Sequence, residues 1–206
     1  MLKCCSLYSG STGNSFFIQT ENTKLLIDAG VSCKKIESAL GSIGINPKEL
    51  NAILITHEHI DHTKGIAVLS SRYNIPIYAN RETWNALVSS NNRLLNSNVN
   101  FFVNDKTFEL NDLKVFPFST PHDALNPCGF NIFKDSKKIS IATDIGHVSP
   151  NIIKCLENSS LLMIEANYDS NVLKYSSYPY MLKKRISGPK RTFRELYNWK
   201  NYSTFN

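Results

Sequence analysis

The strongest constraint on the fold is a run of six residues, 57–62, which reads His-Glu-His-Ile-Asp-His and follows the apolar stretch 52–55 after a single residue. The run contains three imidazoles, two carboxylates and no thiolate, and this donor set suits zinc or a similar divalent ion. A strand that ends in such a cluster predicts a metal site at the end of that strand. A solvated surface loop is the less favoured interpretation.

The same arrangement, an apolar strand followed at once by a possible ligand, occurs four times along the chain. The four residues are Asp28, His57, His122 and Asp144. Side chains at strand ends converge when the strands lie side by side in a sheet. Together they predict one site assembled from distant parts of the chain, although His122 or Asp144 taken alone can be read as an ordinary loop residue.

Hydrophobic periodicity and turn residues predict a mixed α/β (α+β) chain. Helices are expected near residues 33–40, 63–69, 81–89 and 150–157. Strands are expected near residues 2–7, 16–20, 23–27, 51–56, 75–79, 101–103, 107–110, 113–118, 128–133, 138–142 and 161–164. Pro76 places its strand at a sheet edge or marks where that strand begins. The asparagine-rich segment 91–100 is expected to be a loop.

The spacing inside the six-residue run divides its ligands between two ions. His57 and His59 alternate and can face one ion, whereas Asp61 and His62 lie further along and can face another. Asp144, from a distant strand, can bridge the two. A pair of ions ~3.5–4 Å apart holds and ionises a water and stabilises charge on a substrate oxygen. Asp61 is placed to accept a proton from that water, which makes it the candidate catalytic residue.

Other polar residues are candidates for supporting the ligands or contacting a substrate. Ser11 and Asn14 belong to a glycine-containing loop, 9–15, whose hydroxyls and amide can orient a neighbouring site or a phosphate. An ordinary hairpin turn is an equal alternative for that loop. Asp28 is either a loop cap or a support for metal ligands. Glu58 is expected to face solvent or to support a ligand.

The remaining candidates are assigned less specifically. Asp123, Glu165 and Asp169 are expected to be either supporting residues or ordinary loop residues. His147 is expected to lie outside the site.

Composition restricts the compartment and the size of the fold. A chain of 206 residues with 42% hydrophobic content suits one large domain or two small ones with a packed core. No apolar run approaches the ~20 residues of a membrane span, and no long apolar stretch follows Met1, so neither a membrane segment nor a signal peptide is expected. Five scattered cysteines, none in a Cys-x-x-Cys pair, disfavour a disulfide scaffold and a thiolate zinc site. They favour a cytoplasmic protein.

The net charge of +6 is confined to the end of the chain. Residues 181–206 contain seven basic side chains and one acidic one, which leaves 16 of each sign in residues 1–180. The basic balance therefore says little about the partner of the main body. A solvated basic tail is favoured over a phosphate-binding one.

The spacing His57-x-His59-x-Asp61-His62 after a strand resembles the motif of the metallo-β-lactamase-fold hydrolases. Further blocks resemble the YycJ/WalJ branch of that family, at residues 9–14, 26–30, 56–62, 122–124, 143–146, 165–169 and 178–179. The resemblance covers about residues 2–190. Histidine rather than glutamate at position 59 makes the chain unlike the diiron oxidoreductase branch.

This resemblance implies a four-layered αββα sandwich with a dinuclear site at the sheet edge. In such a site His57, His59 and His122 hold the first ion, Asp61 and His62 hold the second, and Asp144 bridges them. Zinc is the expected metal and manganese the alternative. The resemblance also implies phosphodiesterase or nuclease activity, as in ribonuclease Z, with nucleic acid as the substrate.

The end of the chain departs from the family pattern. Family members continue past residues 188–190 with a Gly-His-Leu-Ser block, further helices and strands, and a late histidine that completes the second metal site. Here no histidine follows His147. We therefore expect an incomplete hydrolase domain over 1–190, with C-terminal elements missing or altered, and a basic tail unlike the family over 191–206. We also expect a weak second metal site, and self-association through exposed sheet surface.

Three functions remain open at this point. The favoured one is a phosphodiesterase or nuclease that uses a metal-activated water. The second is a hydrolase of another ester class, a thioesterase or lactonase, on the same site. The third is an inactive metal-binding remnant.

Overall fold

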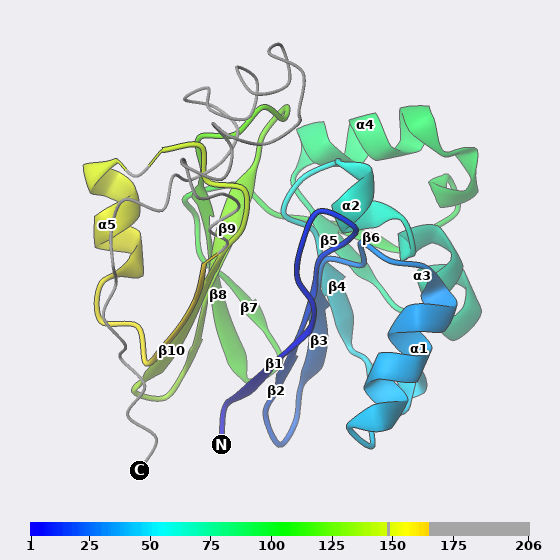
Figure 1. Ribbon diagram of the computed structural model, residues 1–206, viewed down its shortest axis with the longest axis horizontal. Coiled ribbons are helices and arrows are strands. Elements are labelled where there is room, and N and C mark those ends of the chain that lie inside the picture. Colours follow the sequence, from blue (N-terminus) through cyan, green and yellow to red (C-terminus); the bar gives the residue numbers. More distant parts are fainter. Residues whose placement is uncertain (148, 165–206) are drawn as a thin grey trace, which may run out of the picture.

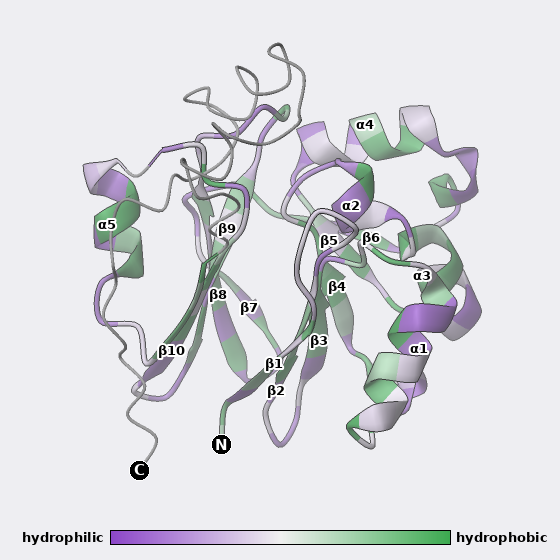
Figure 2. Cartoon of the chain, viewed as in Figure 1, coloured by the Kyte–Doolittle hydropathy of each residue, from purple (hydrophilic) through white to green (hydrophobic). Residues whose placement is uncertain are grey.

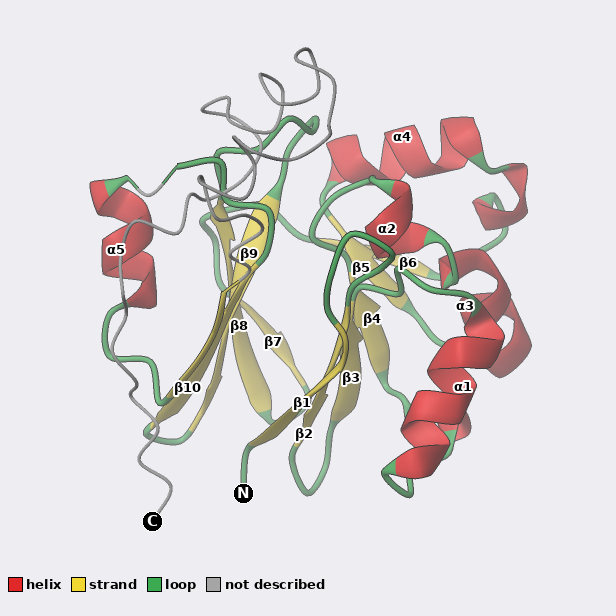
Figure 3. Cartoon of the chain, in the orientation of Figure 1, coloured by secondary structure: helices red, strands yellow, loops and turns green. Residues whose placement is uncertain are grey.

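Two β-sheets stacked face to face form the centre of the molecule, and helices cover their outer faces (Figure 1). This computed structural model describes residues 1–147 and 149–164. The predicted four-layered αββα sandwich is confirmed, and Figure 3 shows the yellow strands of the two sheets between red helices on either side. Within the described residues, no helix is both long and apolar enough to cross a membrane.

The first sheet contains six described strands, in the order in which they occur along the chain. They are β1 (Lys3–Tyr8), β2 (Ser15–Gln19), β3 (Lys24–Ile27), β4 (Ala52–Leu54), β5 (Ile77–Ala79) and β6 (Val99–Phe101). The first three strands pair antiparallel, and β3 to β6 run parallel. The parallel strands end at one edge of the sheet, so the residues after β3 and β4 lie side by side.

Helices α1 (Cys33–Ser42), α3 (Ile66–Tyr73) and α4 (Arg81–Ser90) pack against the outer face of the first sheet. A single helical turn, α2 (Ile60–Thr63), follows β4 after a short loop. Two short 3-10 helices, η1 (Pro47–Glu49) and η2 (Asn92–Leu94), complete the connections.

The second sheet contains five described strands in the order β11-β10-β9-β8-β7. They are β7 (Phe108–Leu110), β8 (Leu113–Ser119), β9 (Cys128–Lys134), β10 (Lys137–Ala142) and β11 (Leu161–Ile164). Strands β7 to β10 pair antiparallel, and β11 pairs parallel with β10. Helix α5 (Pro150–Leu156) connects β10 to β11 and packs on the outer face of this sheet.

Alternation along the strands assigns apolar side chains to separate layers. Leu26 and Ile53 belong to the cluster between the first sheet and its helices, whereas Leu25 and Leu54 belong to the cluster between the sheets. Strand β3 is therefore buried on both faces, as its nearly continuous apolar sequence predicts. In Figure 2 hydrophobic residues gather on the strands, and hydrophilic ones lie on outer turns of α1 and α3.

Three local predictions need correction or refinement. The helix expected near 63–69 is instead two helices, because α2 already begins at Ile60 inside the six-residue run and α3 begins at Ile66. Strand β5 begins directly after Pro76, which confirms the prediction that this proline marks the start of a strand. The alternative, a strand at the sheet edge, is wrong, because β5 lies between β4 and β6. The asparagine-rich segment 91–100, predicted as a loop, contains η2 and the first residues of β6.

All five cysteines are free thiols. Cys33 and Cys128 are buried, and the other three are half-buried.

Candidate metal centre

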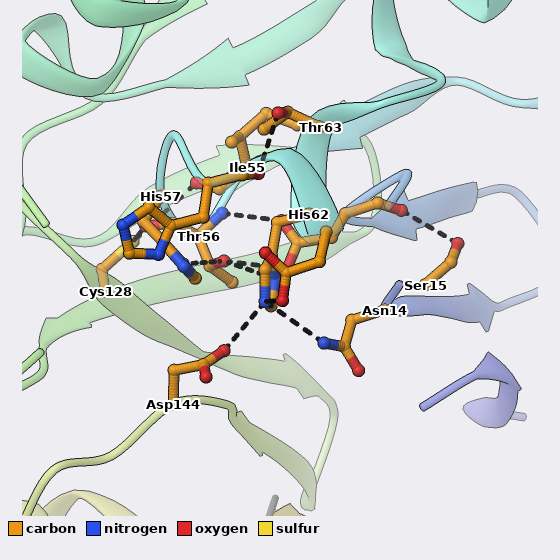
Figure 4. Close-up of polar contacts among 12 residues, drawn as sticks. Asn14, Ser15, Ile55, Thr56, His57, His62, Thr63, Cys128 and Asp144 are labelled. Carbon is orange, nitrogen blue, oxygen red and sulfur yellow. Dashed lines mark hydrogen bonds and ion pairs between the residues drawn. The ribbon is translucent and has the colours of Figure 1, made fainter. Parts of the chain in front are cut away.

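Residues that follow four strands converge at one edge of the sandwich. Asp28 follows β3 and the six-residue run follows β4 in the first sheet, while His122 follows β8 and Asp144 follows β10 in the second. The close-up in Figure 4 shows His57, His62 and Asp144 facing one another from these different segments. The four strand-end positions singled out in the sequence therefore lie together in space.

One group of possible ligands consists of His57, His59 and His122. One ring nitrogen from each lies within 4.8 Å of the others. The Nε2 atom of His122 is 3.1 Å from Nδ1 of His59. His57 is only 2% exposed, and its Nε2 atom is buried without a hydrogen-bond partner among the described residues. An imidazole nitrogen left without a partner in the interior is costly, and a metal ion offers the missing interaction.

A second group consists of His57, His62 and Asp144, whose ligand atoms also lie within 4.8 Å of one another. Nε2 of His62 is 2.8 Å from Oδ2 of Asp144. The two groups share His57, so two cations in them are neighbours. The structure thus brings together five of the six residues predicted as metal ligands.

Asp61 is the sixth predicted ligand, and it belongs to neither group within the described residues. Its Oδ2 atom is 3.7 Å from Nε2 of His62, and its side chain is 32% exposed. Successive residues of a helix point about 100° apart, so the turn of α2 that buries His62 leaves the Asp61 side chain partly exposed. Asp61 therefore borders the site without entering either cluster.

The buried carboxylate of Asp28 fixes the orientation of His62. Its Oδ2 atom is 2.7 Å from Nδ1 of His62 and accepts a 2.8 Å hydrogen bond from the Thr56 hydroxyl, while Oδ1 accepts the Thr56 backbone N–H at 2.9 Å. The Thr56 oxygen is also 2.9 Å from Nδ1 of His57. Because both histidines are engaged at Nδ1, their Nε2 atoms are left to face the site. The prediction that Asp28 supports a ligand agrees with these contacts.

Thr56 was not singled out in the sequence. The sequence feature that could have pointed to it is a hydroxyl residue immediately before the first histidine of the six-residue run.

Backbone conformation aims the two strand-end carboxylates. Asp28 and Asp144 have φ angles of 62° and 51°, in the left-handed region that few residues other than glycine and Asn/Asp adopt. Each bends the chain sharply at the end of its strand. The bend at Asp28 turns its carboxylate toward one ring nitrogen of His62, and the bend at Asp144 turns the other carboxylate toward the opposite ring nitrogen.

Burial and charge give the two central histidines opposite proton affinities. Burial, helped by the neighbouring histidines, lowers the pKa of His57 well below its ordinary value. Burial alone also lowers the pKa of His62, but the carboxylates of Asp28 and Asp144 outweigh it and raise that pKa well above the ordinary value. The pKa of Asp144 is lowered, since the hydrogen bond and charge of His62 outweigh the effect of burial. The two carboxylates therefore favour a positive charge on His62, whereas burial disfavours one on His57.

The glycine-containing loop 9–15 lies directly against this site. Asn14 is 1% exposed, its Nδ2 atom is 3.2 Å from Nε2 of His62, and its Oδ1 atom accepts the backbone N–H of Gly10 at 3.0 Å. Gly13 has a φ of 148°, and a Cβ there would lie 2.5 Å from the carbonyl oxygen of Gly30. The loop therefore requires glycine and directs the Asn14 amide at the metal ligands. Ser11, the other candidate in this loop, is exposed.

Two of the remaining candidates are exposed, and two fall outside the described residues. Asp123, which follows His122 in the sequence, is exposed at the surface. His147, three residues after Asp144, is also exposed. Glu165, Asp169 and the tail 191–206 lie outside the described residues.

Comparison with known proteins identifies the class to which this fold and site belong. The family model described as "Beta-lactamase superfamily domain" matches residues 23–179. Among solved structures, the metallo-β-lactamase fold protein YhfI from Bacillus subtilis superposes with a TM-score of 0.66 at 18% identity, over 82% of this chain and 72% of that one. Zn²⁺-bound PqqB from Methylobacterium extorquens gives a TM-score of 0.65 at 19% identity, over 79% and 64%. The chain therefore belongs to the metallo-β-lactamase superfamily of hydrolases.

Within that superfamily the sequence is similar to two exodeoxyribonucleases. It is 42% identical over 182 residues to exodeoxyribonuclease WalJ of Streptococcus pneumoniae, an alignment that covers 87% of this chain and 68% of the relative. It is 37% identical, with the same coverage, to exodeoxyribonuclease YycJ of Bacillus anthracis. The predicted resemblance to the YycJ/WalJ branch is confirmed.

Proposed function

We propose that this chain is a metal-dependent hydrolase of phosphodiester bonds and that its substrate is DNA. The observation that carries the proposal is the pair of ligand groups that share His57, whose buried Nε2 atom has no hydrogen-bond partner among the described residues. The exodeoxyribonuclease names of the two relatives supply the substrate class. In a chain of this fold, the two ligand groups and the two similar exodeoxyribonucleases support hydrolysis better than a purely structural role.

The donor set fits a divalent metal of the zinc type, because it consists of imidazole nitrogens and a carboxylate. His57, His59 and His122 would hold one ion. His62 and Asp144 would hold a second, with the Asp61 carboxylate beside them. Bound divalent ions of this kind lower the pKa of a water to about 7 and stabilise charge on a substrate oxygen.

The protein's own groups divide the remaining work. The Asp61 carboxylate lies at the open side of the site, 3.7 Å from His62, where it can accept a proton from a nucleophilic water. The Asn14 amide, fixed through its own oxygen, presents N–H groups beside the same ring nitrogen. Asp28 and Thr56 hold the ligand rings in place, so little reorganisation is needed when substrate binds.

Hydrolysis assays with single and double-stranded DNA, RNA of the same sequence, bis-p-nitrophenyl phosphate and a thioester panel test this proposal. Each substrate is incubated with the metal-free chain and with added Zn²⁺ or Mn²⁺. We expect DNA hydrolysis that depends on added metal and that falls by about 100-fold or more in His59→Ala, since that change removes a ligand.

His147→Ala is the matched control, because it removes an exposed histidine that belongs to neither ligand group. It is expected to leave activity unchanged. Hydrolysis of thioesters alone indicates the second ester class. Absence of any activity with either metal, or activity that His59→Ala leaves intact, contradicts the proposed function.

A further inference from the structure

Glu58, the second residue of the six-residue run, contacts the loop that carries His122. Its Oε1 atom accepts the backbone N–H of Leu125 at 2.9 Å. Its Oε2 atom is buried and has no hydrogen-bond partner among the described residues. The side chain thus lies between the two halves of the site. This placement agrees with the prediction that Glu58 supports a ligand and not with the alternative that it faces solvent.

The position of Glu58 in the chain makes this contact significant for the ligands. Glu58 separates His57 from His59, so its carboxylate is anchored within the first ligand group. The Thr63 hydroxyl donates to the carbonyl oxygens of both Glu58 and His59, at 3.3 and 2.8 Å. The turn that presents Glu58 is therefore braced from behind by α2.

The loop after β8 has other attachments. At its start the Gly146 N–H donates to the Pro121 carbonyl at 2.7 Å, and three side-chain bonds hold its far end. Asn80 donates to the Asn126 carbonyl at 2.7 Å, Asn104 donates to the Asn126 side chain at 2.8 Å, and Asn126 donates to Glu82 at 3.0 Å. These bonds fix the end of the loop where β9 begins. The Glu58 bond fixes Leu125, one residue nearer to His122, and joins it to the ligand-bearing turn itself.

We propose that Glu58 is a positioning residue that holds the His122 loop against the His57–His59 turn and so completes the first ligand group. This inference rests on the metal binding in the proposed function. Glu58 is not a ligand in either group, and its Oε1 atom is already engaged by Leu125.

The test is a Co²⁺ titration of the metal-free full chain, followed by the visible absorption of the bound ion. Glu58→Ala is expected to weaken Co²⁺ binding by about 10- to 100-fold, the usual effect of losing a partner that orients a ligand. Glu58→Gln retains a carbonyl oxygen that can accept the Leu125 N–H, so binding within about threefold of the wild type is expected. Glu109→Ala, which removes an exposed glutamate on β7, is the control and should bind as the wild type does.

A double-mutant cycle separates positioning from a general loss of structure. If Glu58 acts through His122, Glu58→Ala adds no further loss in a His122→Ala background. Additive losses, a Gln variant as weak as the Ala variant, or an Ala variant that binds as tightly as the wild type would each overturn the inference. The assay needs no turnover, so it separates the two proposals. A wild-type chain that binds no Co²⁺ contradicts both, whereas tight binding unaffected by Glu58→Ala contradicts the positioning role alone.

Discussion

At the scale of single residues, His62 is the most tightly constrained group in the site. One ring nitrogen lies 2.7 Å from Asp28 and the other lies 2.8 Å from Asp144, and the side chain is fully buried. Asp28 is the partner that no cation needs to displace, because it engages the nitrogen that faces away from the second ligand group. It therefore sets the direction of the nitrogen that can bind metal.

Asp28→Asn tests this role with minimal change in shape. Asparagine tolerates the left-handed backbone at this position, but it has only one oxygen to replace two that accept three contacts. We expect zinc affinity to fall by about 10- to 100-fold, measured by competition with a chromophoric chelator. Asp135→Asn is the control, since Asp135 also has a left-handed φ, of 53°, and its side chain is 80% exposed. Equal zinc affinity in the two variants would contradict the role of Asp28.

The opposite pKa shifts of His57 and His62 predict how the metal-free chain responds to pH. His62 has a raised pKa, so its contribution to stability is full below the unfolded-state pKa of about 6.5 and is lost as pH rises through the higher folded value. His57 has a lowered pKa, so its burial costs stability as pH falls below about 6.5. In EDTA, urea unfolding should therefore show a free energy that decreases on both sides of that pH. The alkaline decrease should shrink in Asp28→Asn, and an unchanged alkaline slope in that variant would refute the assignment.

At the scale of structural elements, backbone hydrogen bonds join the turn after β3 to the loop 9–15 and to helix α2. The Gly30 N–H donates to the Asn14 carbonyl, and the Ala29 N–H donates to the His62 carbonyl, each at 2.8 Å. A Cβ at Gly30 would lie 1.6 Å from the carbonyl oxygen of Asp61. The turn after β3 therefore passes so close to α2 that only glycine fits between them.

Gly30→Ala is expected to destabilise the chain by several kcal/mol, about 3 or more, because the overlap is with backbone that cannot move aside cheaply. The same substitution at Gly41 is the matched control. Gly41 lies in α1, a Cβ there meets nothing within 4 Å, and alanine should stabilise that helix by about 0.5–1 kcal/mol. Urea unfolding of both variants measures the difference. Similar effects at the two positions would show that the close approach at Gly30 is absent in solution.

The elements and the ligand positions were accessible from the sequence, whereas the contacts between them were not. Apolar strands that end in ligand-type residues predicted that His57, His122 and Asp144 meet, because strand ends in a sheet share an edge. A hydroxyl residue before the first histidine is visible in the sequence, but the placement of the Thr56 hydroxyl between His57 and His62 and the Glu58 bond to Leu125 are not. The Thr56 contacts depend on how the turns after β3 and β4 pack together, and the Glu58 bond depends on how the second sheet lies over the first. Spacing paired Asp61 with His62, and the Oδ2 atom of Asp61 lies 3.7 Å from Nε2 of His62, although Asp61 belongs to neither ligand group among the described residues.

At the scale of the whole molecule, the candidate metal centre is a polar junction between two sheets that otherwise meet through apolar side chains. His57, His59 and His62 come from the first sheet, and His122 and Asp144 come from the second. The cluster between the sheets, which includes Ile18, Leu25 and Phe130, holds them together below the site. An ion bound at the junction therefore links both halves of the sandwich, and ligand binding to the folded state alone stabilises the entire fold.

Addition of zinc should consequently raise the melting temperature of the whole chain. Free zinc at 100 times its dissociation constant stabilises the fold by about 2.7 kcal/mol, and in a protein of this size that corresponds to roughly 5–10 °C. Circular dichroism melts with Zn²⁺ and with EDTA measure the shift, which EDTA should reverse.

The variant His122→Ala makes this prediction specific to the junction. It removes a ligand contributed by the second sheet and leaves the three histidines of the first, so an ion bound there no longer joins the sheets through the first ligand group. We expect less than half of the wild-type shift at the same zinc concentration, since losing one protein ligand lowers affinity and the shift depends on affinity. His147→Ala, with an exposed histidine removed instead, should keep the full shift. A wild-type chain that melts at the same temperature with zinc and with EDTA, or an equal shift in His122→Ala, would mean that the two sheets are not linked by a metal at this junction.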